Sequence, residues 1–216
     1  MITAKDWWGV LTNYNNQIFP LQFIVMGTAA VLLLFLYLKP CKITNALMKG
    51  FLSLANLWNG IMFFMILGTN LPSPLRFIQG SLFIAIGIFL AIDVFTGKTE
   101  LTWPHSKGVR TITVILLTLV AIYPIVGLLR GHTAVQLIYP GTVPCATTSL
   151  SLVLLSASLP KVNKIPYVLL LIWAIPFAPL IQIPQFKVYE DSIMFIVGIY
   201  SLIALIISLR KEKARV

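Results

Sequence analysis

Residues 123–150 read YPIVGLLRGHTAVQLIYPGTVPCATTSL, and this stretch decides how the rest of the chain is interpreted. It lies between two strongly apolar segments, yet it contains one of the two histidines, His132, and one of the two cysteines, Cys145. It also contains Arg130 and three prolines. Apolar chains rarely gather ionisable and helix-breaking residues without a functional reason. The stretch therefore predicts a polar site inside a chain that is otherwise suited to lipid.

The composition indicates an integral membrane protein. Of the 216 residues, 58% are hydrophobic and only 10% are charged, whereas soluble domains carry about 25% charged residues. The formal net charge of +10 would suggest nucleic-acid binding in a soluble protein. Here the basic residues fall mainly in short loops and at the C-terminus, where they report topology and contact anionic lipid headgroups. We therefore expect the lipid bilayer as a partner and no nucleic acid.

Seven segments predict an all-α, polytopic protein of seven transmembrane helices, because a helix needs about 20 apolar residues to cross the hydrocarbon core. The fifth segment is short at its outer end, where Pro140 and Pro144 interrupt it. Turn and stop residues such as Lys39-Pro40 and Pro160-Lys161 separate the segments. The segments are 20–38, 46–68, 75–96, 110–130, 144–159, 165–183 and 192–209.

The lysines and arginines predict the orientation, because cytoplasmic loops carry an excess of them. Along an alternating path, twelve fall on one side and four on the other. The N-terminus is therefore expected outside the cell and the C-terminus in the cytoplasm. The twelve are Lys39, Lys42, Lys49, Lys98, Lys107, Arg110, Lys161, Lys164, Arg210, Lys211, Lys213 and Arg215, and the four are Lys5, Arg76, Arg130 and Lys187.

The chain divides into three parts on this prediction. Residues 1–19 are too polar to span, and their Trp7, Trp8 and Tyr14 suit the outer headgroup layer, so they form an extracytoplasmic interfacial segment. Residues 20–209 form a single membrane domain, and residues 210–216 form a basic cytoplasmic tail.

A weak internal repeat relates the first three segments to the last three. Trp58 aligns with Trp173, and Ile86-Gly87-Ile88 aligns with Val197-Gly198-Ile199. Leu38-Lys39-Pro40 aligns with Leu159-Pro160-Lys161 at the first turn. Both triplets start outside, so the pattern indicates a parallel 3+1+3 plan in which the fourth helix is a linker.

Helix-breaking residues predict a water-filled cavity that opens to the outside. Pro124, Pro144, Pro176 and Pro179 all fall in the outer halves of the fourth to sixth helices. A proline inside a helix frees a backbone carbonyl, and in lipid such a group must face protein or water. Ordinary kinks that only shape the packing are the alternative.

Nine residues from five segments are predicted to border this cavity. Asn56 and Asn59 are separated by three residues, so they share one face of the second helix near mid-bilayer. Buried amides cost several kcal/mol unless they are partnered or wet, and one shared cavity satisfies all of these polar groups together. The nine ligand-binding candidates are Asn56, Asn59, Gln79, Tyr123, Arg130, His132, Cys145, Thr147 and Thr148.

Such a site predicts a protein that binds or transports a small polar or anionic solute. Arg130 and the N-terminus of the fifth helix make the rim electropositive, which favours an anionic or strongly polar ligand. The alternative is a membrane-embedded sensor or accessory subunit that binds a partner protein and transports nothing. A third class is an enzyme that pairs Cys145 with His132.

Neither a cofactor nor a metal is expected. No nucleophile–base–orienter set, phosphate loop or paired-cysteine motif is present, so no enzymatic activity is assigned. Cys145 and His132 are only two candidate metal ligands, whereas stable sites need three or four. Asp93, near the cytoplasmic end of the third helix, is expected to pair with a basic loop residue.

The chain resembles a family of bacterial multi-pass membrane proteins of unknown function. The resemblance covers nearly the whole chain and implies a multi-pass fold in the inner (plasma) membrane of a bacterium, but no activity. It rests on Tyr14-Asn15, Pro20-Leu21-Gln22, Trp58 with Gly60, Tyr123-Pro124 with Gly127, Gly131-His132, Pro144-Cys145 and Thr147-Thr148.

Overall fold

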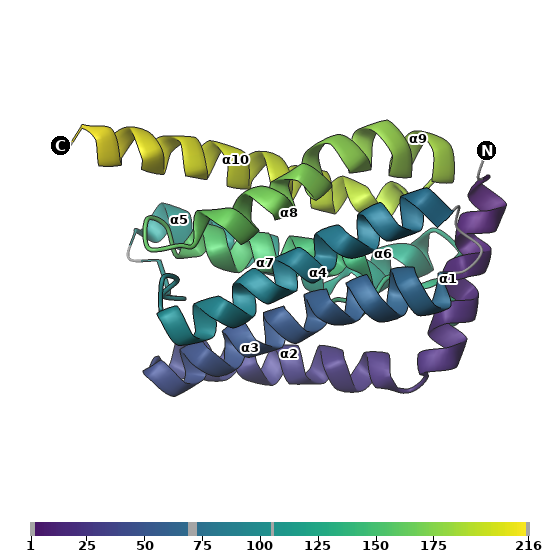
Figure 1. The fold of residues 1–216 in the computed structure, drawn as a ribbon, viewed down its shortest axis with the longest axis horizontal. Helices are drawn as coiled ribbons and strands as arrows, with labels where there is room; N and C mark the ends of the chain where they lie inside the picture. The colour runs from purple at the N-terminus through teal and green to yellow at the C-terminus, as the bar shows by residue number, and fades with distance from the viewer. Residues whose placement is uncertain (1–2, 69–72, 105, 215–216) are drawn as a thin grey trace.

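The computed structural model describes residues 3–68, 73–104 and 106–214, and the regular elements among them are all helical (Figure 1). The α-helices are α1 (Ala4–Ile18), α2 (Leu21–Leu38), α3 (Lys42–Trp58), α4 (Ser73–Thr96), α5 (Lys107–Ala121), α6 (Tyr123–Leu129), α7 (Pro144–Ala157), α8 (Lys164–Phe177), α9 (Ile183–Phe186) and α10 (Ser192–Lys213). Two π-helical segments, η1 (Asn59–Leu67) and η3 (Ala178–Gln182), and two 3-10 turns, η2 (Ala134–Gln136) and η4 (Tyr189–Asp191), complete the set.

Helical structure over all seven predicted segments is confirmed, and five or six of the segments are long enough to cross a membrane. The five are Leu21–Leu38, Lys42–Leu67, Pro74–Thr96, Lys164–Phe186 and Tyr189–Lys213. The pair α5 and α6, bent by 52°, passes the same test as one span. The remaining segment, α7, has 14 residues, a length of about 21 Å against a hydrocarbon core of about 30 Å.

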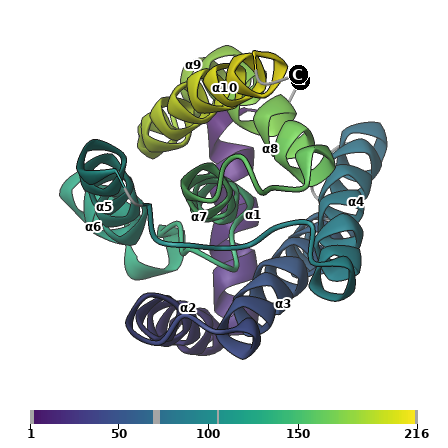
Figure 2. The same ribbon diagram turned by 90° about the vertical axis from the view of Figure 1, so that its left-hand side faces the viewer.

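Helix α7 is the centre of the molecule. Figure 2 shows it enclosed by the longer helices, and it contacts α3, α5, α8 and α10. All 14 of its residues are buried. Its sequence PCATTSLSLVLLSA is rich in small side chains, which let neighbouring helices approach closely. The surrounding helices instead expose large apolar side chains, such as Phe23 on α2 and Phe95 on α4, as lipid-facing surfaces do.

The helices run between two ends of the molecule. At the C-terminal end, the segments 97–104 and 158–163 meet beside the end of α10. The backbone N–H of Glu100 donates to the Lys161 carbonyl, and Lys164 pairs with Glu212 at 2.6 Å. The opposite end, here called the α1 end, is covered by α1, which lies across the other helices (Figure 1). Helix α10 continues to Lys213, so part of the predicted tail is helical.

Helix α1 has its own start signal and buries one face. The Thr3 and Asp6 side chains each bond the other's backbone N–H, which satisfies donors that would be orphaned at the helix start. Trp7, Leu11 and Tyr14 are buried against the bundle. The predicted interfacial segment is thus a helix over residues 4–18 that closes one end of the molecule.

Candidate functional site

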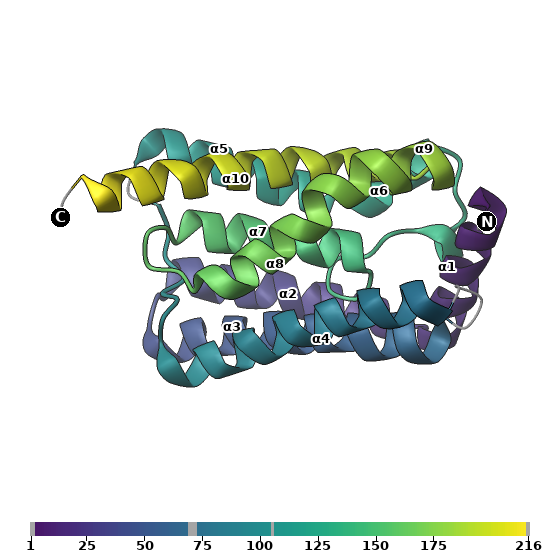
Figure 3. The same ribbon diagram turned by 45° about the horizontal axis from the view of Figure 1, so that its top comes forward.

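The chain enters the interior before it forms α7. Figure 3 shows the segment after η2 leading inward from the α1 end to the start of α7, and residues Leu137–Val143 are all buried. Gly141 has φ +94°, and a Cβ there would lie 2.5 Å from Val25. Only glycine therefore fits this inward turn.

Side chains of α1 satisfy the backbone of this inward segment. The Nδ2 atom of Asn15 donates to the Val135 and Leu137 carbonyl oxygens, both at 2.9 Å. The Tyr14 hydroxyl donates to the Thr142 carbonyl at 2.6 Å and accepts from the Trp58 indole N–H at 2.7 Å. Unpaired backbone groups are costly inside an apolar protein, so these bonds fix where α7 begins.

Helix α7 carries polar side chains on opposite faces. Cys145 and Ser149 are separated by four residues, as are Thr147 and Ser151, so each pair lies on one face. Two residues of an α-helix correspond to about 200° of rotation, so the two pairs face in opposite directions. One pair points toward α3 and the other toward α6 and η4, as the contacts below show.

The face toward α3 meets two buried amides, and these four residues form the amide cluster. The Nδ2 atom of Asn59 donates to Thr147 Oγ1 at 3.0 Å, and that of Asn56 donates to Ser151 Oγ at 3.3 Å. Each amide also donates to a carbonyl one turn earlier in α3, so its oxygen must point away. Both asparagines are 0% exposed, and neither Oδ1 atom has a hydrogen-bond partner among the described residues.

The opposite face of α7 meets two carboxylates, and this group forms the acidic cluster: Tyr123, His132, Cys145, Glu190 and Asp191. The Tyr123 hydroxyl donates to Asp191 Oδ1 at 3.3 Å, and the Cys145 thiol lies beside the same carboxylate. The Nε2 atom of His132 lies 3.1 Å from Glu190 Oε1. Asp191 directly precedes α10, so α6, α7 and the start of α10 all contribute.

Both carboxylates are enclosed. The side chains of Glu190 and Asp191 are 1% and 0% exposed. Both Glu190 oxygens and the Oδ2 atom of Asp191 form no hydrogen bond within the described residues. Gly127 lets α6 pack against the inward segment, since a Cβ there would lie 2.9 Å from the Leu137 side chain.

Helix α1 covers the entrance to the acidic cluster. The ring of Trp8 stacks on that of His132 with centroids 4.1 Å apart. The Trp8 indole N–H donates to the Phe186 carbonyl at 3.1 Å, which fixes the ring over the histidine. The His132 side chain is 21% exposed, whereas the carboxylates behind it are buried.

The structure divides the nine predicted residues. Asn56, Asn59 and Thr147 meet in the amide cluster, and Tyr123, His132 and Cys145 belong to the acidic cluster. Thr148 is buried and its hydroxyl has no partner within the described chain. Arg130 is exposed and lies over the Tyr189 ring at 4.3 Å, and Gln79 is half-buried on α4. Helix α7 separates the two clusters.

Glu190 and Asp191 were absent from the predicted site. The chain has only six acidic residues, and these two are adjacent at the start of its last apolar segment. Intramembrane ionisable residues mark functional sites by default. The predicted last helix begins at residue 192, so both carboxylates fall in a loop and outside the predicted site.

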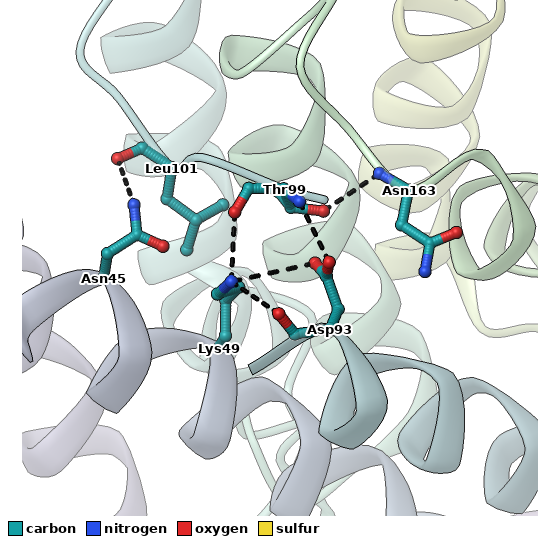
Figure 4. Close-up of polar contacts among 6 residues, drawn as sticks. All are labelled: Asn45, Lys49, Asp93, Thr99, Leu101 and Asn163. Carbon is teal, nitrogen blue, oxygen red and sulfur yellow. Dashed lines mark hydrogen bonds and ion pairs between the residues drawn. The ribbon is translucent and has the colours of Figure 1, made fainter. Parts of the chain in front are cut away.

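A separate polar network closes the C-terminal end (Figure 4). The Nζ atom of Lys49 donates to the carbonyl oxygens of Asp93, at 2.7 Å, and Thr99, at 3.0 Å. The backbone N–H of Thr99 donates to Asp93 Oδ1, and the Thr99 hydroxyl accepts from the Asn163 N–H, both at 2.9 Å. Asp93 thus pairs with a lysine of α3 rather than with the expected loop residue.

Three cavities lie outside both clusters. One of about 500 Å³ lies between α5 and α10, and one of about 330 Å³ lies between α2 and α5. A third, of about 600 Å³, borders Cys41 and Lys49 at the C-terminal end. None of these three is lined by the nine predicted residues. The outward-opening cavity therefore stays a prediction.

The chain belongs to a family of unknown function. Residues 4–215 match the family described as DUF6064, a family of unknown function. This agrees with the resemblance to an uncharacterised family and covers both polar clusters. No curated protein matches the chain, and neither does any solved structure.

Proposed function

We propose that this protein is a seven-pass membrane protein that binds a small polar solute at the amide cluster and transports it. The α1 end faces the outside and the C-terminal end faces the cytoplasm. This orientation is supported by the twelve-to-four distribution of lysines and arginines. In this arrangement the bent pair of α5 and α6 is one span, and α7 with its inward segment Leu137–Val143 is another.

The observation that carries the proposal is the pair of amide oxygens on Asn56 and Asn59. Both are fully buried and lack a hydrogen-bond partner among the described residues. Each unsatisfied buried acceptor costs about 1–3 kcal/mol. They face α7 near its N-terminus, and discontinuous helices that start inside the bilayer bind substrates in many transporters.

The cluster favours a solute that carries hydrogen-bond donors. The free groups of Asn56 and Asn59 are acceptors, so hydroxyl, amide or ammonium groups would satisfy them. Arg130, the basis for predicting an anionic ligand, is exposed, while the buried charged groups nearest α7 are carboxylates. A neutral or cationic polar solute therefore fits better than an anion.

Transport requires that the ends open in turn, and both are closed in this structure. Helix α1 closes one end, and the network around Lys49 closes the other. The predicted 3+1+3 repeat suits such a motion, because its two halves could rock against each other. A Cβ at Gly87 would lie 2.6 Å from Leu57, beside Trp58, and one at Gly198 would lie 3.0 Å from Ala174, beside Trp173. The two helix pairs thus pack through aligned glycines.

Thermal-shift and uptake measurements test the proposal. Purified protein is screened against polyols, sugars, amino acids, amines and carboxylates, and each solute that stabilises it is then tested for uptake into proteoliposomes. We expect a stabilising solute with donor groups, and Asn59→Leu should lose both the shift and the uptake. Asn45→Leu removes a distant amide, which bonds the Leu101 carbonyl, and should keep both.

Other outcomes would contradict transport. A ligand that still stabilises Asn59→Leu would place the site elsewhere. The absence of any uptake, together with a protein that co-purifies in fixed ratio, would favour the accessory-subunit class. An enzyme that pairs Cys145 with His132 is the least supported class, because these side chains contact different carboxylates.

A further inference from the structure

The acidic cluster presents an electrostatic problem that the proposed solute site does not solve. Glu190 and Asp191 are adjacent, buried and turned toward the protein interior. In the described chain their one ion-pair partner is His132, which contacts Glu190. Burying an ionised carboxylate costs several kcal/mol, and a second negative charge beside it adds repulsion. With at most one cation, His132, beside them, Glu190 and Asp191 are not both ionised at this place.

The groups that face the carboxylates come from several elements. Tyr123 of α6 and Cys145 of α7 contact Asp191, and both are neutral when protonated. His132 follows α6 and contacts Glu190. The nearby cations point outward, because Arg130 lies over Tyr189 and Lys187 is exposed. Trp173 of α8 approaches the Cys145 thiol with an uncharged indole.

We propose that Glu190 and Asp191, with His132 and Tyr123, form a proton-binding site that is loaded from the α1 end. One of the two carboxylates holds the proton as a neutral carboxylic acid, so that the interior holds one negative charge and not two. Proton binding at this site does not depend on solute transport, because the cluster lies on the face of α7 opposite Asn56 and Asn59.

The arrangement favours a proton over a metal ion. Within the described residues, no three side chains among His, Cys, Asp and Glu converge as metal ligands. The Oδ1 atom of Asp191 already accepts from Tyr123, and Glu190 faces an imidazole nitrogen. Stable metal sites use three or more such ligands.

His132 provides the entry step. It is 21% exposed, so its ring takes up a proton from water at the α1 end. The Nε2 atom lies 3.1 Å from Glu190 Oε1 without a hydrogen bond in this structure, so a rotation of the imidazolium ring first aligns the two atoms. The Nε2–H bond then breaks as an O–H bond forms on Glu190 Oε1. A neutral imidazole and a carboxylic acid remain. Trp8, which stacks on His132, limits how freely water reaches the ring.

Infrared difference spectroscopy of the purified protein in lipid tests the site directly. Stepping the pH reveals the carbonyl stretch of any protonated carboxylic acid. We expect such a band near neutral pH in the wild type, and we expect it to be lost or shifted in both Glu190→Gln and Asp191→Asn. Glu212→Gln and Glu100→Gln change exposed carboxylates that pair with lysines and should leave the band unchanged. Two single variants keep the test informative should one fail to fold.

The entry step has its own measurement. After a pH jump, the band should appear at least about tenfold more slowly in His132→Asn, because a positioned acid–base group typically contributes 10²–10⁴-fold to proton transfer. A wild type without a protonated-acid band, or a band unchanged in both carboxylate variants, would overturn the proposal. An unaltered rate in His132→Asn would overturn the entry step. None of these results depends on solute uptake, so failure here and failure of the transport proposal are distinguishable.

Discussion

The Nζ atom of Lys49 lies 2.7 Å from the backbone carbonyl oxygen of Asp93, and the Asp93 carboxylate lies 4.0 Å from the same nitrogen. The two side chains are 4% and 0% exposed. A lysine of α3 is therefore held mainly by carbonyl oxygens, with a buried carboxylate balancing its charge. This contact joins α3 to α4 and to the segment after α4, and it seals the C-terminal end.

Lys49→Met should destabilise the protein strongly. It leaves Asp93 buried without its cation, and breaking a buried pair typically costs about 3–5 kcal/mol. Thermal or denaturant unfolding in detergent measures the loss. Lys161→Met removes an exposed pair with Glu100 and should change stability little, because solvent screens such pairs. An equal loss of unfolding free energy in the two variants would show that burial of the Lys49–Asp93 pair does not matter.

Gly60→Ala should loosen the contact between η1 and α4. A Cβ at position 60 would lie 2.7 Å from the Gly80 carbonyl oxygen and 2.7 Å from Ile84, so the helices must separate. We expect a loss of about 1–3 kcal/mol, the usual cost of overpacking. Gly50→Ala is the matched control, because no other group lies within 4 Å of its Cβ position. That variant should be neutral or more stable by about 0.5–1 kcal/mol.

Tyr14→Phe should destabilise the inward segment before α7. The change leaves the Thr142 carbonyl and the Trp58 indole N–H without their bonds to the hydroxyl. A cost of about 1–3 kcal/mol is expected for buried groups left unpaired. Tyr37→Phe is the control: it keeps the ring that packs against Trp103, leaves the bonds of Tyr14 in place and should change stability little. Faster hydrogen exchange confined to residues 137–147 would locate the effect.

Cys41 offers a native test of the orientation. It is exposed at the C-terminal end, whereas Cys145 is buried. Bonds from the backbone N–H and hydroxyl of Thr44 lower the pKa of the Cys41 thiol, which favours the reactive thiolate. An impermeant maleimide should label Cys41 only after cells are permeabilised. Lys5→Cys in a Cys41→Ser background should label in intact cells, and the reverse pattern would show an inverted orientation.

The sequence predicted the helices well, because apolar runs of about 20 residues have few alternatives in lipid. It did not predict that the 14 residues of α7 would form the centre of the molecule. Hydropathy measures affinity for lipid. A helix rich in serine, threonine and alanine that other helices cover does not contact lipid, so hydropathy does not reveal its central position. The π-helical turns η1 and η3 were also missed, because they depend on packing and on prolines such as Pro179.

The sequence predicts several residues of the polar sites but not which of them lie together. The prediction brings Asn59 and Thr147 to one cavity because Asn59 reaches mid-bilayer from the cytoplasmic side and Thr147 lies in the first turn of a helix that starts outside, and the two form a hydrogen bond. Depth along a helix says little about direction around it. Cys145 and Thr147 were grouped although they are two residues apart on a helix and therefore point to opposite sides.

The central position of α7 has a consequence for biogenesis. A helix of 14 residues that follows a non-helical entry segment is a poor candidate for independent release from the translocon into lipid. The helices that cover it on one side, α8 and α10, are synthesised after it. A nascent chain that ends before α10 has an open groove beside Cys145 and Ser149. Full enclosure of α7 therefore requires the last helix, which makes the C-terminal third of the chain necessary for packing the middle.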